Sequence, residues 1–177
     1  MGIPVVVPMK SISITFISIL FFGYVSGAFA ANTLSSPTGK VMLTVSGSIK
    51  VTNNAESAEF DREMLQKLSW QKINSATAWT TGTPSFEGVL LEDLLTLVGA
   101  RGNSIVAKAL NDYAVTIPWK HLEEHKILLA MKMNGKFMRV RDKGPVWIIY
   151  PIESVEEAKG NSHNKFMVWQ LDRISIE

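Results

Sequence analysis

A series of short strands separated by turn residues is the feature that most constrains this sequence. The strongest turn is Asn134-Gly135, which joins the strand-like stretches 127–133 and 136–140. Both residues tolerate positive φ, so they predict a tight two-residue β-hairpin. Further strand-like stretches are 41–46, 73–79, 105–110, 113–117, 146–150 and 166–176. Strands outnumber helices and show no repeated βαβ spacing, so we expect one mixed α+β domain, mostly β with a few short helices.

Two segments have helical rather than strand-like spacing. Asp61 is placed to cap a short helix that continues through Leu68. Residues 88–99 carry a stripe of leucines and a valine at helical spacing, and Gly99 is placed as the C-terminal stop of that helix. Both helices would be short additions to a domain built mainly from strands.

The N-terminal thirty residues have the composition of a secretory signal. Lys10 precedes the apolar run 12–25, and the segment closes with small residues up to Ala30. A membrane helix needs about 20 apolar residues, and this run is shorter. We therefore expect a signal peptide over 1–30 that is cleaved after Ala30, a flexible leader over 31–40, and a periplasmic domain over 41–177. Either Met1 or Met9 can be the true start.

The chain contains no cysteine, and its 18 basic and 16 acidic residues give a net charge of +2. An exported domain without cysteine has no disulfides, so burial must supply its stability. No basic tract or RNA-binding motif occurs, which argues against a nucleic-acid partner. After the signal, no apolar run is long enough to predict a transmembrane segment.

Four blocks carry a family likeness. Residues 86–95, 111–118, 127–135 and 143–151 follow, in that order, the patterns W-x-G-V-x-L-x-x-L-L, D-G-Y-x-x-x-I-P, L-L-A-x-x-x-N-G and G-x-P-x-R-x-x-x-P. A weaker echo of K-x-x-K-W-x-x-x-I-x-V lies in 165–176. Together they resemble the sulfite oxidase-like molybdopterin-binding domains. The resemblance implies that fold, a molybdopterin-type cofactor and an oxidoreductase ancestry.

The departures from the family pattern concern the metal. The family's metal-ligating cysteine corresponds roughly to Ser75–Gly82, which offers only Ser, Ala, Thr, Trp and Gly, and the arginine after Gly-x-Pro is replaced by Trp147. Thiolate is the side-chain ligand best suited to high-valent molybdenum. We therefore expect no molybdenum, no metal-ligating residue and no catalytic residue, and an enzyme is the less favoured reading.

Small exported proteins of this cysteine-less kind resemble a subgroup that binds free pterins. Its members partner with membrane proteins that make or degrade cyclic di-GMP. The resemblance therefore implies a pterin ligand and, as partner, the periplasmic domain of a membrane GGDEF or EAL protein. A molybdopterin-dependent oxidoreductase with atypical metal ligation and a ligand-free adaptor are the alternative functions.

Several polar and aromatic residues are candidates for pterin recognition. The Asp112 carboxylate can accept the ring N–H and the amino group of a pterin together, with Asn111 reading the carbonyl. The alternative is that Asn111 and Asp112 only form a turn. Trp79 is the stacking candidate, and Tyr113 and Trp147 are candidates for a second wall; as an alternative, tryptophans are usually core residues.

The remaining charged candidates form two groups. Arg139, Arg141 and Lys143 surround a Gly-Pro turn, where they can meet a ligand tail or simply form solvated surface. His121 and His125 stand four residues apart, a spacing that can bind a metal on a helix. Without a third ligand at a suitable spacing, we interpret them as a solvated helix face, and we assign no role to His163.

Overall fold

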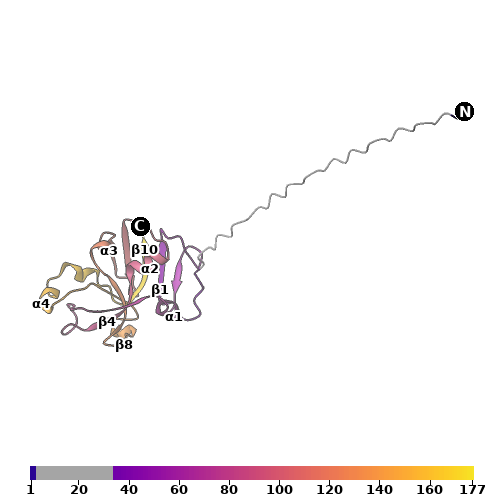
Figure 1. Cartoon of the computed structure of the whole chain (residues 1–177). Helices are drawn as coiled ribbons and strands as arrows, with labels where there is room; N and C mark the ends of the chain where they lie inside the picture. Colours follow the sequence, from indigo (N-terminus) through magenta and orange to yellow (C-terminus); the bar gives the residue numbers. More distant parts are fainter. Residues whose placement is uncertain (3–33) are drawn as a thin grey trace. The chain divides into compact units, whose positions relative to one another are not determined.

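Two five-stranded β-sheets organise the part of the chain that the structure describes, residues 1–2 and 34–177 of a computed structural model (Figure 1). The predicted signal peptide and its cleavage site lie outside these residues. None of the described helices is long and apolar enough to cross a membrane. The described part of the predicted leader contacts the domain, because the amides of Thr38 and Gly39 donate to the Asp61 carboxylate over 2.9 and 2.8 Å.

The first sheet has the strand order β2-β1-β10-β5-β6. These strands are β1 (Leu43–Gly47), β2 (Ala58–Phe60), β5 (Ser104–Ala109), β6 (Ala114–Pro118) and β10 (Leu171–Ile176). β1 runs parallel to β10, and the other neighbours are antiparallel. The sheet is therefore mixed, as predicted.

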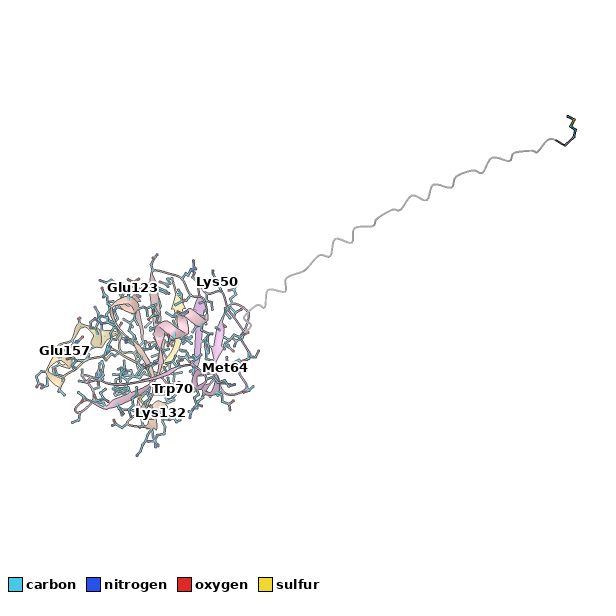
Figure 2. The ribbon with its side chains drawn as sticks, viewed as in Figure 1. Lys50, Met64, Trp70, Glu123, Lys132 and Glu157 are labelled. Atoms are coloured by element: carbon cyan, nitrogen blue, oxygen red, sulfur yellow. The ribbon has the colours of Figure 1, made fainter. Side chains whose placement is uncertain are left out.

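The second sheet is antiparallel and centres on β7. Its strands are β3 (Trp70–Asn74), β4 (Ser85–Leu90), β7 (Leu128–Met133), β8 (Lys136–Phe137) and β9 (Trp147–Ile149). Asn134 and Gly135 have φ angles of 49° and 75°, which confirms the predicted hairpin between β7 and β8. At the outer part of this sheet, Lys132 lies over the ring of Trp70, and both are labelled in Figure 2.

Short helices join these strands. They are α1 (Arg62–Gln66), α2 (Leu91–Leu97), α3 (His121–Glu124), α4 (Val155–Ala158) and the 3₁₀ turns η1 (Val140–Asp142) and η2 (Ser162–Phe166). Asp61 caps α1 as predicted, because its carboxylate accepts the amide of Met64 over 2.9 Å. Gly99, at φ 61°, follows the end of α2 as predicted.

The apolar residues form two buried clusters, and β7 contributes to both. Leu129 and Met131 point into the larger cluster, which includes the leucines of α2, whereas Leu128 and Ala130 point into a smaller cluster with Trp147. Successive strand residues face opposite sides, so a strand that is buried on both faces shows no polar alternation. The fold class predicted from the sequence is confirmed.

The largest differences from the predicted boundaries concern four elements. The helix expected over 88–99 begins only at Leu91, because Gly88 belongs to β4, where a Cβ atom would collide with the Leu129 carbonyl of β7. The strand expected over 73–79 ends at Asn74. The strand expected over 136–140 stops at Phe137 and η1 follows, while the strand expected over 166–176 begins at Leu171 after η2. Pairing with neighbouring strands, rather than local hydropathy, sets these limits.

Candidate functional site

An aromatic-lined cavity of about 250 Å³ lies beside the start of β10. We call it the aromatic slot. Four segments supply its walls: the loop between β3 and β4, the turn between β5 and β6, η2, and the residues that lead into β10. Its lining residues are Trp79, Ala109, Asn111, Tyr113, Asn164, Lys165, Met167, Val168 and Trp169.

Trp79 is held in place by its own loop. The Thr77 hydroxyl is buried, accepts the Trp79 amide over 3.1 Å and lies 2.9 Å from the Thr80 hydroxyl. The Trp79 side chain remains 39% exposed, so one part of the indole is available to a ligand. The sequence predicted that Trp79 would lie at the end of a strand. The structure places it in a hydrogen-bonded turn instead.

Trp169 forms the wall next to Trp79. The two ring centroids are 5.0 Å apart and the planes meet at 89°, the edge-to-face arrangement that aromatic quadrupoles favour. The Lys143 ammonium lies 4.3 Å from the Trp169 ring centroid. Sequence reasoning placed Trp169 in the core. The only signal that could have marked it is its position within the weak family echo over 165–176.

Asn111 and Tyr113 enter the slot from the turn between β5 and β6. The Asn111 side-chain oxygen accepts the Tyr113 amide over 3.2 Å, and the Tyr113 hydroxyl donates to the Lys165 carbonyl over 3.2 Å. The turn and η2 are therefore fixed to each other. The predicted candidates Trp79, Asn111 and Tyr113 are brought together in one cavity.

Asp112, in the same turn, is directed elsewhere. With φ at 66°, its carboxylate lies 2.8 Å from the Lys108 ammonium and 3.4 Å from the Arg173 guanidinium. The hydrogen bond and the charge of Lys108, followed by Arg173, hold the pKa of Asp112 below its usual value. Asp112 is not among the slot residues. Asp112 is therefore not placed to read the edge of a pterin that is held in the slot.

Trp147 is also misplaced by the sequence interpretation. Its side chain is fully buried, its indole N–H donates to the Met167 carbonyl over 3.0 Å, and its ring packs edge-on against Phe86 at 5.5 Å. No ligand in the slot can reach a ring that is already enclosed. Trp147 instead lies behind Trp79 and Trp169, at centroid distances of 6.2 and 6.4 Å, and supports them.

The three basic candidates do not share one location. Arg141 and Lys143 line a concavity of about 350 Å³ that shares Trp79 with the slot. Arg139 instead pairs with Asp142 over 2.6 Å and lines a larger groove. Two of the three cations are therefore placed to meet a ligand tail that extends past Trp79.

Asn164 adds a polar group that sequence reasoning missed. Its amide nitrogen donates to the Ala158 carbonyl over 2.7 Å. Its side-chain oxygen is the one buried side-chain polar atom without a hydrogen-bond partner among the described residues. A buried acceptor without a partner is unfavourable by about 1–3 kcal/mol. Asn164 lines the slot, so a ligand N–H group that reached this oxygen would remove that cost.

The segment that corresponds to the metal-binding loop of sulfite oxidase-like domains contains no suitable metal donor. Ser75 is fully buried, and its hydroxyl donates to the Tyr150 carbonyl over 2.8 Å and accepts the Ile152 amide over 3.0 Å. The Thr77 hydroxyl is likewise engaged. The chain has no cysteine to supply a thiolate, and the described residues contain no group of three His, Asp or Glu side chains able to hold a metal. This donor set does not fit molybdenum.

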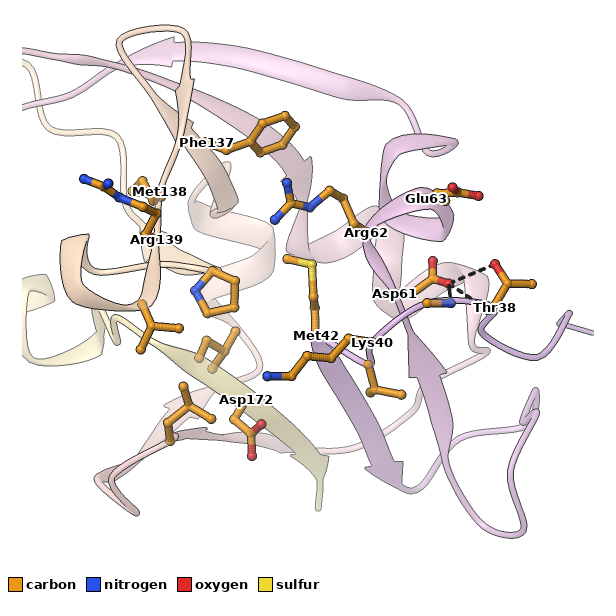
Figure 3. A pocket seen from close by; sticks show the side chains of 16 residues that line it. Thr38, Lys40, Met42, Asp61, Arg62, Glu63, Phe137, Met138, Arg139 and Asp172 are labelled. Carbon is orange, nitrogen blue, oxygen red and sulfur yellow. Dashed lines mark hydrogen bonds between the residues drawn. The ribbon is translucent and has the colours of Figure 1, made fainter.

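The groove that Arg139 lines has a volume of about 640 Å³ and lies on the other side of η1 (Figure 3). The guanidinium of Arg62 lies 4.6 Å from the Phe137 ring centroid, and in Figure 3 it points in among Phe137, Met42 and Arg139. Three exposed apolar side chains line the groove: Val41, Leu110 and Val140. Charged side chains line it as well: Lys40, Asp61, Arg62, Glu63, Arg139 and Asp172. We call this feature the apolar groove after its exposed apolar side chains.

The described residues form a mixed domain, mostly β, with an aromatic cavity beside cationic side chains. The sequence matches the oxidoreductase molybdopterin binding domain family over residues 42–155, and the chain belongs to that family. This confirms the family resemblance inferred from the four sequence blocks.

One solved structure with the same fold is the sulfane dehydrogenase SoxCD from Paracoccus pantotrophus. The TM-score is 0.57 at 16% sequence identity, and the match covers 81% of this chain and 40% of that one. This chain thus spans less than half of the SoxCD chain, and the likeness shows a shared fold. Among curated proteins, none matches the sequence significantly.

Proposed function

We propose that this chain is a periplasmic pterin-binding protein that relays the presence of its ligand to a membrane-bound cyclic di-GMP signalling protein. One observation carries the first half of the proposal. The domain keeps a ring-sized aromatic slot on a molybdopterin-binding fold, while the loop that corresponds to the metal site is closed by hydrogen-bonded Ser75 and Thr77. Pterin recognition without metal chemistry suits such a site.

The size and chemistry of the slot match a pterin ring. Small-molecule sites typically measure about 300–1,000 Å³, so a cavity of about 250 Å³ favours a compact bicyclic ring over a dinucleotide form of the cofactor. Trp79, Tyr113 and Trp169 offer aromatic faces and edges to the ring. Asn111 offers an amide for the polar edge, and the buried Asn164 oxygen becomes an acceptor for the ligand only if its side chain shifts to uncover it. A hydroxylated or phosphorylated tail can extend toward Arg141 and Lys143.

The second half of the proposal, the relay, is supported by the connection between the aromatic slot and the apolar groove. Leu110 lines the groove and Tyr113 lines the slot, and both belong to the β5–β6 turn. Gln170 adds a second link, because its side chain donates to the Val140 carbonyl over 2.7 Å and its amide donates to the Lys143 carbonyl over 3.0 Å. A partner seated in the groove would therefore contact backbone segments that also shape the slot.

Calorimetric titration with neopterin tests ligand binding. Replacing Trp79 or Trp169 with alanine should weaken binding about 5- to 30-fold, because an aromatic contact contributes about 1–2 kcal/mol. Leu97→Ala is a matched control, since Leu97 is 38% exposed and lies outside the slot. Asp112→Asn should leave the affinity within about twofold. Equal losses in all four variants, or no binding of neopterin by the parent protein, would contradict the proposal.

The family match favours one alternative, an oxidoreductase that binds molybdopterin with atypical metal ligation. Elemental analysis of protein purified from a host that makes the cofactor separates the two functions. We expect molybdenum far below one atom per chain. Stoichiometric molybdenum would establish the alternative and refute a metal-free receptor.

The relay is tested by repeating the neopterin titration in the presence of the periplasmic domain of a candidate GGDEF or EAL partner. Thermodynamic reciprocity requires the partner to change pterin affinity by the factor by which the pterin changes partner affinity, typically 5- to 150-fold. Val140→Asp, which places a charge in the apolar groove, should abolish that change and preserve binding of neopterin alone. Identical affinities with and without the partner would leave a simple carrier as the better account.

A further inference from the structure

All three histidines of the chain lie in one cluster. The ring centroids of His121 and His125 are 5.6 Å apart, and His163 lies 5.4 Å from His121 and 4.4 Å from His125. Tyr150 and Phe166 complete what we call the histidine cluster. This geometry corrects the interpretation of His121 and His125 as a solvated helix face, and it gives a position of interest to His163, to which the sequence assigned no role.

The cluster joins three separate parts of the chain. His121 and His125 come from α3 and its end, Tyr150 follows β9, and His163 belongs to η2. A ring nitrogen of His121, Nδ1, lies 3.0 Å from the buried Tyr150 hydroxyl. His163 stacks on the Tyr150 ring at 4.8 Å and 11°, and its Nδ1 lies 3.0 Å from the Asn161 side-chain oxygen. The stacking of His163 on Tyr150 fixes η2 to the segment that follows β9.

The surroundings disfavour protonated histidine. Burial lowers the pKa of His121, which is only 8% exposed, and the charges of His163 and His125 lower it further. Burial and His125 also lower the pKa of His163. Burial raises the pKa of Tyr150, so its phenol stays neutral and cannot balance an imidazolium.

Other charged groups face the cluster from each neighbouring element, and they do not cancel the lowering of the pKa of His121 and His163. Lys120, at the N-cap of α3, lowers the pKa of His121, as the other histidines do. The Lys165 ammonium lies 4.9 Å from the Phe166 ring centroid. Glu124 favours protonation of His121 and His163, and Glu157 of α4 favours that of His163. The ion pairs of the described residues include neither carboxylate with a histidine.

The segment that carries His163 also forms one wall of the aromatic slot. Asn164 and Lys165 follow His163 directly in η2, and both line the slot. The Tyr113 hydroxyl donates to the Lys165 carbonyl on the same segment. Any displacement of η2 therefore moves the unpaired Asn164 oxygen and the support of Tyr113 together.

We propose that protonation of the histidine cluster loosens η2 and opens the aromatic slot, so that the ligand is released in acid and held at neutral pH. This inference deepens the proposed function, since it assigns a pH control to the same binding site. The ordinary pKa of histidine is about 6.5. Above that pH the histidines are neutral in both the closed and the open states, and the closed state has its full stability. As the pH falls below that value, the open state binds protons first, and the closed state is progressively lost.

Linkage sets the size of the effect. A histidine that titrates near 6.5 in the open state and stays neutral in the closed state shifts the opening equilibrium about tenfold between pH 7.5 and 5.5. The two histidines with lowered pKa therefore allow a shift of up to about a hundredfold. The affinity for neopterin falls by the full factor only where the open state becomes the major one, so we expect a fall of up to about a hundredfold over that interval.

The opening is measured first on the protein without ligand. Hydrogen exchange of the amides in 154–166, corrected for the intrinsic pH dependence of exchange, should accelerate at least tenfold from pH 7.5 to 5.5. Amides of β5, an interior strand of the first sheet, should not change. Proton NMR can follow the three histidine rings separately and should show two of them titrating below pH 6.5. Unchanged exchange in 154–166, or three rings titrating near 6.5, would overturn the proposal.

Variants then connect the opening with the slot. His163→Phe keeps an aromatic ring against Tyr150 and removes one titrating group, so the pH dependence of both exchange and neopterin affinity should shrink about tenfold. His121→Gln removes the other histidine with a lowered pKa and serves the same purpose if His163→Phe does not fold. An undiminished pH dependence in either folded variant would overturn the assignment. If neopterin does not bind at any pH, the pterin function fails, whereas the exchange experiment still decides whether the histidine cluster controls η2.

Discussion

Replacing Ser75 with alanine removes a buried hydroxyl that connects the end of β3 with the segment after β9. The Ser75 Oγ accepts the Ile152 amide over 3.0 Å and donates to the Tyr150 carbonyl over 2.8 Å. The side chain is fully buried, so water cannot replace either bond. The substitution therefore leaves the buried Ile152 amide and the Tyr150 carbonyl without this hydrogen-bond partner.

The expected loss follows from those two bonds. An unsatisfied buried N–H costs about 1–3 kcal/mol, and the lost bond to the carbonyl adds about 0.5–1.5 kcal/mol. We therefore expect Ser75→Ala to lower the free energy of unfolding by about 2–4 kcal/mol. That is a large part of the roughly 5–15 kcal/mol that stabilises a typical domain.

Urea unfolding followed by tryptophan fluorescence measures this loss, with the denaturant slope shared between variants. Ser46→Ala is the matched control, because Ser46 lies half-buried in β1 and its hydroxyl makes no hydrogen bond among the described residues. The control should change stability by no more than about 0.5 kcal/mol. A loss below about 1 kcal/mol for Ser75→Ala would refute the view that this hydroxyl stabilises the fold by connecting the end of β3 with the segment after β9.

Two further predictions concern the fold. Gly88→Ala should destabilise by at least about 3 kcal/mol in thermal unfolding, because the new Cβ would collide with the Leu129 carbonyl, whereas Gly160→Ala, with open space around it, should be nearly neutral. Amide hydrogen bonds from Met64 and Gly39 lower the pKa of Asp61, so its contribution to stability is present above about pH 3.8 and is lost as the pH falls through the lower folded value. Asp61→Asn should therefore reduce stability at pH 7 and flatten the acid limb of a stability–pH curve; an unchanged limb would contradict this.

The architecture could be predicted because its signals are local. The Asn134-Gly135 turn, the Asp61 cap and the Gly99 stop each depend on residues within a few positions, and each occurs where the sequence indicated. The helix expected over 88–99 was wrong in its first turn because Gly88, Val89 and Leu90 suit a buried strand as well as a helix. Only the pairing of β4 with β7 decides between the two.

The site could be predicted only in part, because its members meet through long-range packing. Trp79 was the stacking candidate at the end of an expected strand, and it lines the slot from a hydrogen-bonded turn instead. Trp147 was misjudged because its enclosure depends on Phe86 and Met167, which are distant in sequence. His163 was missed for the same reason, since 38 residues separate it from His125 and only the fold brings their rings within 4.4 Å.

The parallel pairing of β1 with β10 has a consequence for how the domain is made. Thr44 is aligned with Arg173, so the central strand pair of the first sheet joins the beginning and the end of the domain. Chain segments this far apart close a long loop, which makes folding slow. A ribosome must also have synthesised β10 before β1 can find its neighbour on that side. The domain therefore completes its folding only after β10 has been synthesised, and until then β1 needs protection from pairing with other chains.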